Sequence, residues 1–284
     1  MTATSPDALA APPGPAGRQS FPGLVGRGLR DIRQRHRLIR YLVGADLKRT
    51  HADTLFGQIW WLLDPLLQMA IYVVLVTVIF RRATPDYPLF LFAAILPWKW
   101  FATTLNDATT SVTGRQGLIR QIQFPKLVLP TAAVTAGTVS FAVGLLALGM
   151  VYVFYLHRLS AWVLLIPLIA VVQYAFTLAL GVALAAMNAF YRDVHNVLRH
   201  VTRLWFYLSP ALYSIDHLRE GSVERFLLQL NPMTHLLESY RAVTWGTTAP
   251  DWLGLLAVLG LSVVLLVFAV ALFKRVEPAF ARIL

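Results

Sequence analysis

The sequence contains no cysteine and few charged residues. Cysteine is absent from all 284 residues, which excludes disulfide bonds and thiolate metal sites from the chain. Charged residues make up 14% of it, against about 25% in an average soluble domain. The mean hydropathy is +0.60, and several nearly uncharged stretches reach the ~18 residues that a helix needs to cross a bilayer. We therefore predict a polytopic membrane protein.

Sequence signatures of catalysis are also missing. The chain has no GxxxxGK(S/T) phosphate-binding loop, no HExxH zinc motif and no GxSxG nucleophile motif. His195 and His200 are five residues apart, which places them on different sides of a helix and disfavours a two-histidine metal site. We therefore expect no catalytic residue, no metal and no cofactor on this chain. A membrane enzyme or a scaffold stays open as an alternative class of function.

Six apolar stretches are candidates for membrane spans, of which the fifth is the weakest. They are Gln58–Phe80, Pro88–Thr104, Leu127–Leu156, Trp162–Met187, Val201–Ile215 and Trp252–Phe273. With both termini on one side, eighteen of the 25 Lys and Arg residues fall on that side and six on the other. This distribution fits cytoplasmic termini, because cytoplasmic segments retain positive charge. The net charge of +11 therefore indicates orientation in a membrane, and we expect no nucleic-acid partner.

The chain divides into three segments. Residues 1–23 are rich in Ala, Pro and Gly and are expected to form a disordered cytoplasmic tail. Residues 24–50 carry apolar residues at steps of three and four with arginines largely off that stripe, which is typical of an amphipathic helix in the membrane interface. A surface helix of a soluble domain is the alternative for them. Residues 51–284 are predicted to form an all-α, six-span domain, in which the outer segment 216–251 is partly buried and re-entrant.

Two ionisable residues lie inside predicted spans. Asp64 is six residues into the first span and Lys99 about five residues from the end of the second, so both lie roughly 8–9 Å deep at 1.5 Å per residue. Because the two spans are antiparallel neighbours, we predict an Asp64–Lys99 ion pair. Alternatively, Lys99 extends to the interface alone and Asp64 faces a polar cavity.

Aromatic residues gather in and at the ends of the spans. An interfacial belt of Trp and Tyr is the default explanation. The alternative is a pore lining on which sugar rings stack, and for it we select the residues inside spans: Tyr72, Phe101, Phe206 and Tyr207.

A polar, basic segment separates the second and third spans. In SVTGRQGLIRQIQFP, residues 111–125, Val112, Ile119 and Ile122 share one helical face among arginines and glutamines. Pro125 is expected to end this segment and to start the third span, because proline suits a first helical turn. The segment is either a passive linker or a docking surface.

Six motifs in order carry a resemblance to a known family. They are DLKRTHADTLFGQIWWLLDPLLQ (46–68), LPWKWF (96–101), IRQIQFPKLVLP (119–130), FYRDVHNVL (190–198), WFYLSPALYSI (205–215) and NPMTHLLESYR (231–241). Through them the chain resembles the permease subunits of type-2 ABC exporters, in the branch that moves O-antigens, capsules, teichoic acids and galactans. It departs from that family at His51-Ala52-Asp53, Phe56, Lys99 and Arg282.

The resemblance implies a transport subunit that is not an enzyme by itself. It implies a homodimer with two cytoplasmic ATP-binding subunits, which hold ATP and Mg, in the cytoplasmic membrane of a bacterium. The substrate would be a polyprenyl-diphosphate-linked polysaccharide, which moves through a channel between the two copies of the chain. Membrane lipids would surround the two copies. Efflux of a small molecule or lipid by the same fold is the alternative.

The resemblance also implies roles for particular residues. The loop between the second and third spans would be a coupling helix against the ATPase, formed by Val112, Arg115, Gln116, Ile119, Arg120, Ile122, Phe124 and Pro125. The basic interfacial helix would dock the lipid diphosphate through charge-assisted bonds from Arg37, Arg40, Lys48 and Arg49. The outer segment would close the channel, with Asn231, Pro232, Tyr240 and Arg241 at the gate.

Overall fold

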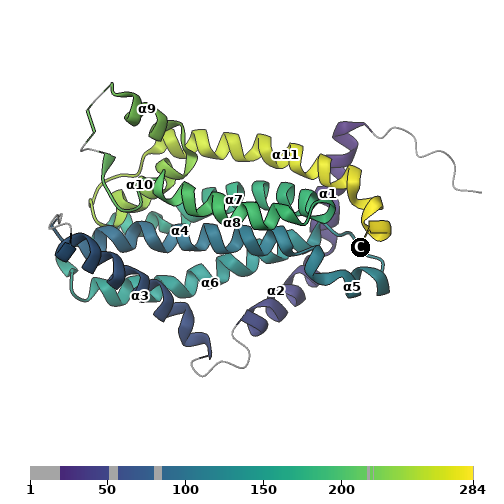
Figure 1. Ribbon diagram of the computed structural model, residues 1–284, viewed down its shortest axis with the longest axis horizontal. Helices are drawn as coiled ribbons and strands as arrows, with labels where there is room; N and C mark the ends of the chain where they lie inside the picture. The colour runs from purple at the N-terminus through teal and green to yellow at the C-terminus, as the bar shows by residue number, and fades with distance from the viewer. Residues whose placement is uncertain (1–19, 51–56, 80–84, 216–217, 220, 284) are drawn as a thin grey trace, which may run out of the picture.

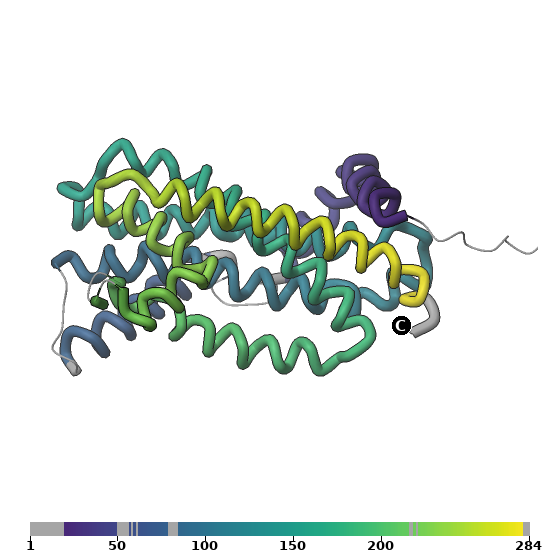
Figure 2. The backbone as a smooth tube through the Cα atoms, turned by 90° about the horizontal axis from the view of Figure 1, so that it is seen from above, coloured from purple at the N-terminus to yellow at the C-terminus, as the bar shows by residue number. Residues whose placement is uncertain are grey.

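The protein is a bundle of long helices that run side by side (Figures 1 and 2). The computed structural model describes residues 20–50, 57–79, 85–215, 218–219 and 221–283, and every regular element in these ranges is helical. The bundle is built from α4 (Tyr87–Thr110), α6 (Val128–Tyr152), α7 (Ile166–Phe190) and α11 (Trp252–Ile283). Each of these four provides a helix long and apolar enough to cross a membrane.

Two of the six predicted spans have a different form in the structure. The first is α3 (Trp60–Val74), which contains Pro65 and continues as a π-helical turn over Leu75–Ile79. Its apolar part, Leu62–Val78, is shorter than the four long helices. The fifth, predicted at 201–215, is not one helix, because α8 (Asp193–Tyr207) ends eight residues before the predicted end of the span. Pro210 disfavours helical backbone at the residue before it and has no amide hydrogen to donate.

The predicted interfacial helix at 24–50 is two helices. These are α1 (Phe21–Gln34) and α2 (His36–Thr50), which Arg35 separates with φ −102° and ψ 22°. Most of the predicted N-terminal tail, residues 1–19, lies outside the described residues, as do the family departures at 51–53 and 56. For Arg282, the backbone is described and the side chain is not.

Short helices cover the two ends of the bundle. One end carries α1, α5 (Gln116–Gln121) and the C-terminus, and the other carries α9 (Val223–Leu230) and α10 (Pro232–Thr244), as Figure 1 shows. At the first end, Lys274 of α11 forms ion pairs with Asp31 of α1 and with Glu277. Glu277 also accepts a hydrogen bond from the backbone amide of Lys126. These contacts join α1, α11 and the entry to α6.

The long helices approach closely where small residues face them. A Cβ atom on Gly137 of α6 would lie 1.9 Å from Oγ1 of Thr104 in α4, and one on Gly144 would lie 2.8 Å from Leu96. Membrane helices associate through such contacts, because lipid supplies no hydrophobic force between them. A buried polar residue adds a link, since Gln173 of α7 donates to the carbonyl oxygen of Pro97 in α4 at 2.8 Å.

Replacing Gly137 by Ala should therefore destabilise the bundle. The methyl group has no room unless α4 and α6 separate, and overpacking of this kind costs about 1–3 kcal/mol. We expect a lower midpoint of thermal unfolding in detergent, followed by tryptophan fluorescence. Gly149 lies on the same helix, and nothing lies within 4 Å of a Cβ built there, so Gly149→Ala is the matched control. Equal midpoints for the two variants would contradict the close contact.

Candidate functional site

A cavity of about 640 Å³ opens among α2, α3, α4 and α6. Six charged residues line it: Asp46, Arg49, Asp64, Lys99, Asp107 and Arg115. Hydroxyl groups of Thr103, Thr104, Thr110, Ser111 and Ser140 and the aromatic side chains of Trp60, Trp100 and Phe141 complete the wall. The hydroxyls and aromatic faces suit a ligand rich in hydroxyl groups, such as a sugar, and the cations among the charged residues suit an anionic group on that ligand.

The cavity holds the ion pair predicted inside the spans. Nζ of Lys99 lies 3.1 Å from Oδ2 of Asp64, with the two side chains 31% and 48% exposed. The contact joins α3 to α4. The structure thus brings the two residues together as their equal depths in neighbouring helices predicted, although both charges retain access to the cavity.

Residues predicted for three separate roles meet in this cavity. Arg49 was assigned to lipid docking, Arg115 to coupling, and Lys99 to the intramembrane pair. Arg115 forms an ion pair with Asp46 of α2, which ties the loop after α4 to the interfacial helix. The sequence analysis did not select Asp46 and Asp107 as site residues. Each is an acidic residue near the end of an otherwise apolar or basic helix, and that isolated charge could have marked them as candidates. Among the described residues, no group of three or more His, Cys, Asp or Glu side chains could hold a metal ion.

The four predicted docking residues are exposed but do not share one face of α2. Arg37, Arg40 and Lys48 lie on the side away from Ile39 and Leu42, which pack into the core. Arg49 is half a turn from Arg40 and also lines the cavity.

The coupling segment differs from the single helix predicted. It consists of a 3₁₀ turn at Thr113–Arg115 followed by α5, which is six residues long. Val112, Ile119 and Phe124 are buried. Ile122 is not on their face, because its backbone is extended beyond the end of α5 and its side chain is 48% exposed. It lies beside exposed Arg120, while Gln116 is half-buried.

Pro125 does not start the third span. Helix α6 begins at Val128, whose amide donates to the carbonyl oxygen of Pro125 at 3.2 Å. Pro125 is therefore the acceptor of the turn that leads into α6, and its own lack of an amide hydrogen costs nothing there.

Two of the four predicted pore aromatics are core residues. Phe101 has no exposed surface and Phe206 is buried. The ring of Phe101 stacks on Phe176 at 5.8 Å and meets Trp205 edge-on at 5.4 Å. Within one copy of the chain these rings therefore pack against protein and do not line a pore. Tyr72 is half-buried, and Tyr207 is 56% exposed at the end of α8.

Arg241 is buried and holds the turn after α8 in place. Its guanidinium donates to the carbonyl oxygens of Ala211 at 2.6 Å and Tyr213 at 2.9 Å, and to Glu238 at 3.0 Å. The same group lies 3.9 Å from the ring centre of Phe90 in α4. Tyr240 beside it is also buried. These two predicted gate residues are thus packed inside the protein.

Asn231 joins the start of α10 to the end of α8. Its Oδ1 accepts hydrogen bonds from the amide of Met233 at 3.0 Å and from Nε1 of Trp205 at 2.8 Å. Its Nδ2 donates to Oγ of Ser209 at 2.8 Å. Pro232 occupies the first turn of α10, where proline is well tolerated. Asn231 is therefore both a helix cap and a tie between two helices.

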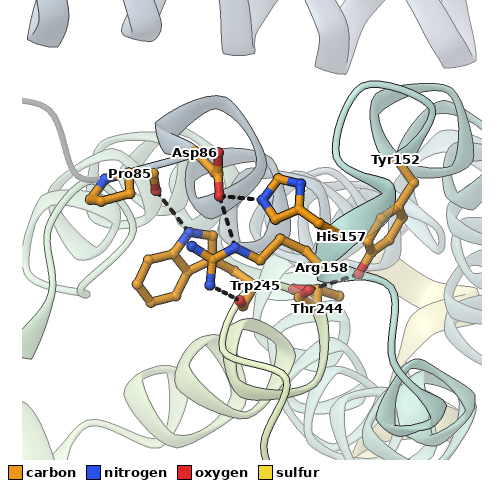
Figure 3. Close-up of polar contacts among 7 residues, drawn as sticks. All are labelled: Pro85, Asp86, Tyr152, His157, Arg158, Thr244 and Trp245. Atoms are coloured by element: carbon orange, nitrogen blue, oxygen red, sulfur yellow. Dashed lines mark hydrogen bonds and ion pairs between the residues drawn. The ribbon is translucent and has the colours of Figure 1, made fainter.

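A second polar cluster lies at the same end of the bundle (Figure 3). Oδ2 of Asp86 lies 2.9 Å from Nε2 of His157 and accepts a hydrogen bond from Nε of Arg158 at 2.8 Å. Arg158 covers the ring of Trp245, whose Nε1 donates to the carbonyl oxygen of Pro85 at 3.0 Å. The hydrogen bonds from His157 and Arg158 lower the pKa of the Asp86 carboxyl. Their contribution to stability is therefore fully present above the ordinary pKa of the carboxyl, and it is lost as the pH falls through the lowered value.

The Asp64–Lys99 contact can be measured with a double-mutant cycle. Asp64→Asn and Lys99→Met should each lower the midpoint of thermal unfolding, because each leaves the other charge unpaired. The double variant should recover ~0.5–1 kcal/mol relative to the sum of the single losses, a modest value because the pair is partly exposed. A double variant whose loss equals that sum would show that the two charges do not interact.

Removal of the Arg241 guanidinium should be more damaging. Arg241→Gln leaves buried carbonyl oxygens without a donor, and the loss of a buried hydrogen-bonded charge costs about 3–5 kcal/mol. We expect poor recovery of monodisperse protein and a clearly lower unfolding midpoint. The exposed Arg219 is the control, and Arg219→Gln should behave as the unaltered protein. An Arg241→Gln variant as stable as that control would refute the role of Arg241.

Comparison with known proteins identifies relatives over most of the chain. A family model described as "ABC-2 type transporter" matches residues 37–245. The O-antigen export system permease protein RfbA of Myxococcus xanthus is 35% identical over 260 residues, covering 90% of this chain and 98% of that protein. Two proteins of the same name from Klebsiella pneumoniae are 26% and 27% identical, each over 87% of this chain and 95% of their own length. The chain belongs to the ABC-2 type transporter family.

Proposed function

We propose that this chain is the transmembrane subunit of an exporter for a polysaccharide of the O-antigen type, carried on polyprenyl diphosphate. The observation that carries the proposal is the cavity, whose wall includes both Arg49 of the basic helix α2 and Lys99 of the apolar helix α4. Cations at the edge of an apolar bundle suit a diphosphate, and hydroxyl and aromatic groups suit the sugars that follow it. The relatives, which are O-antigen export permeases by name, support the same substrate.

The orientation follows from charge. The basic helices α1 and α2 and the loop with α5 share the end of the bundle that we assign to the cytoplasm, in the cytoplasmic membrane of a bacterium. Both termini lie on that side. The end with α9 and α10 then faces outward, and the Asp86 cluster lies at the outer surface. The six-span topology places α3 and α8 in the membrane as well.

ATP hydrolysis is assigned to a separate cytoplasmic subunit, which holds ATP and Mg²⁺. The surface offered to it is α5 with Arg120 and Ile122, both exposed. The Arg115–Asp46 ion pair connects this loop to α2. A push on α5 would therefore move the basic helix and the wall of the cavity together, which couples nucleotide binding to access for the lipid diphosphate.

Two copies of the chain would enclose the channel. Helix α3 exposes a ridge of apolar side chains at Leu67, Ile71, Val74 and Val78, and a second copy or lipid must cover it. Tyr72 and the exposed Tyr207 would face the passage, where sugar rings can stack on them. The buried ties made by Asn231 and Arg241 would hold α9 and α10 across its outer mouth.

Efflux of a small molecule or lipid is the second candidate. A volume of about 640 Å³ lies within the range of pockets that hold drug-sized ligands. The two candidates differ in what stimulates ATP hydrolysis. The chain should be purified with its ATPase and reconstituted in lipid. Stimulation by lipid-linked O-antigen, and not by small apolar compounds, supports glycan export. The reverse result would favour efflux.

Neutralising the basic face of α2 tests the docking step. Replacing Arg37, Arg40, Lys48 and Arg49 together by Gln should reduce O-antigen export to background, because the diphosphate loses its charge-assisted partners. Assembly with the ATPase should remain, since α5 is unchanged. Export is measured by surface staining of the glycan, and assembly by co-purification.

The control removes the same amount of charge from the neighbouring helix α1 and from Arg35, which follows it. Arg27, Arg30, Arg33 and Arg35 replaced by Gln should leave export largely intact. Equal loss in both variants would indicate a general attraction to the membrane, and normal export by the α2 variant would exclude docking there.

A further inference from the structure

Helix α8 presents three distinct faces along its length. At 100° per residue, Leu198, Thr202 and Phe206 fall on one side, and all three are buried. The next side carries exposed apolar residues at Val197, Val201, Leu204 and Leu208. The third carries exposed polar residues, which are Arg192, Asn196, Arg199, Arg203 and Tyr207. We call the last set the basic track and the second the apolar ridge.

The basic track extends alongside the apolar bundle. The amide of His195 donates to Oδ1 of Asn188, near the end of α7, at 3.2 Å. Arg199 and Arg203 follow four and eight residues later, about 6 and 12 Å further along the axis. Beyond them, Trp205 contacts Phe101 of α4 at 5.4 Å. Helices α4 and α7 both have the length and composition of spans, so both arginines lie beside membrane-spanning segments. Figure 2 shows α8 along one edge of the bundle.

The arginines of the track lack an anionic partner within the described part of the chain. Arg199 donates a hydrogen bond to Oδ1 of Asn196 at 2.6 Å, and no ion pair of Arg199 or Arg203 occurs among these residues. An arginine near the middle of a membrane helix costs about 2.5–3.5 kcal/mol on insertion scales and usually marks the path of a substrate or ion. With α8 in the membrane, as in the proposed topology, the track therefore requires water or an anion in front of it.

We propose that the basic track and the apolar ridge of α8 together bind a prenyl diphosphate and guide it through the membrane. The track supplies guanidinium groups for the diphosphate oxygens, which arginine meets with paired hydrogen bonds. The ridge follows the track around the helix, with exposed His200 and Asp193 between them, and it supplies contact for the prenyl chain. A free sugar or an inorganic anion would use only one of these faces, whereas a diphosphate joined to an apolar chain uses both. The inference rests on the proposed function and adds a second site for its substrate, remote in sequence from α2.

The absence of cysteine makes a direct test possible. In the full chain assembled with its ATPase in lipid nanodiscs, Asn196→Cys places a thiol on the track and Val201→Cys places one on the ridge. Each is treated with a negatively and a positively charged water-soluble thiosulfonate reagent. On the track we expect the negative reagent to be preferred by about tenfold relative to a free thiol, which corresponds to ~1.4 kcal/mol. On the ridge we expect slow reaction with both.

Variants of the arginines test the source of the preference. Adding Arg199→Gln and Arg203→Gln to Asn196→Cys should abolish it, whereas Arg199→Lys with Arg203→Lys should retain most of it. Arg275→Gln, at an exposed position of α11, is the control and should leave it unchanged. A thiol at 196 that resists both reagents would show that the track faces lipid, which overturns the proposal.

A second arm identifies the ligand. Farnesyl diphosphate should slow labelling of Asn196→Cys severalfold, whereas farnesol and added phosphatidylglycerol should not. Equal protection by phosphatidylglycerol would reduce the track to a lipid headgroup contact and overturn the proposal. Protection by farnesyl diphosphate without O-antigen export would leave the track in place and refute the proposed function. O-antigen export without protection by farnesyl diphosphate would support the proposed function and refute the role of the track.

Discussion

The low dielectric of the membrane interior is the constraint on which this structure depends. A backbone or side-chain polar group buried there must find its partner within the protein. Gln173 meets this requirement by donating to the carbonyl oxygen of Pro97. Arg241 meets it with the carbonyl oxygens of the turn that follows α8 and with Glu238. Each of these two residues therefore joins two segments, and the contacts that satisfy it also help to fix how the helices are arranged.

Exposed charge is the counterpart of this rule. Arginines that are not paired inside the bundle gather on α1 and α2 at one end and on one side of α8. In the proposed orientation, the first group faces the anionic head groups of the membrane interface. The second follows helices that have the composition of spans, where water or a substrate anion must take that place. Two basic surfaces with an acid–base cavity between the interfacial helix and the bundle suit a ligand that is a diphosphate at one point and a sugar at the next.

In the function that we propose, the loop after α4 transmits the movement of a partner subunit to these sites. Its buried residues Val112 and Ile119 anchor it to the core, and Arg115 ties it to Asp46 of α2. Arg120 and Ile122, on its other face, have exposed side chains. A short element that is anchored on one face and exposed on the other can transmit displacement, because packed contacts shift as a unit and do not deform continuously. The family implies an ATP-binding partner, and we propose that this partner acts on the loop.

Local pattern in the sequence was sufficient for the helical membrane character, the basic face of α2 and the Asp64–Lys99 contact. Each depends on helical periodicity or on depth along neighbouring helices, which are short-range quantities. Tertiary packing alone decided that Arg49, Lys99 and Arg115 share one cavity, and that Phe101 is buried. These facts depend on which faces of distant helices meet, and hydropathy does not encode that choice when lipid and protein neighbours are equally apolar. The end of α8 at Tyr207 had a local signal in Pro210, but the three faces of that helix became visible only once the bundle had covered one of them.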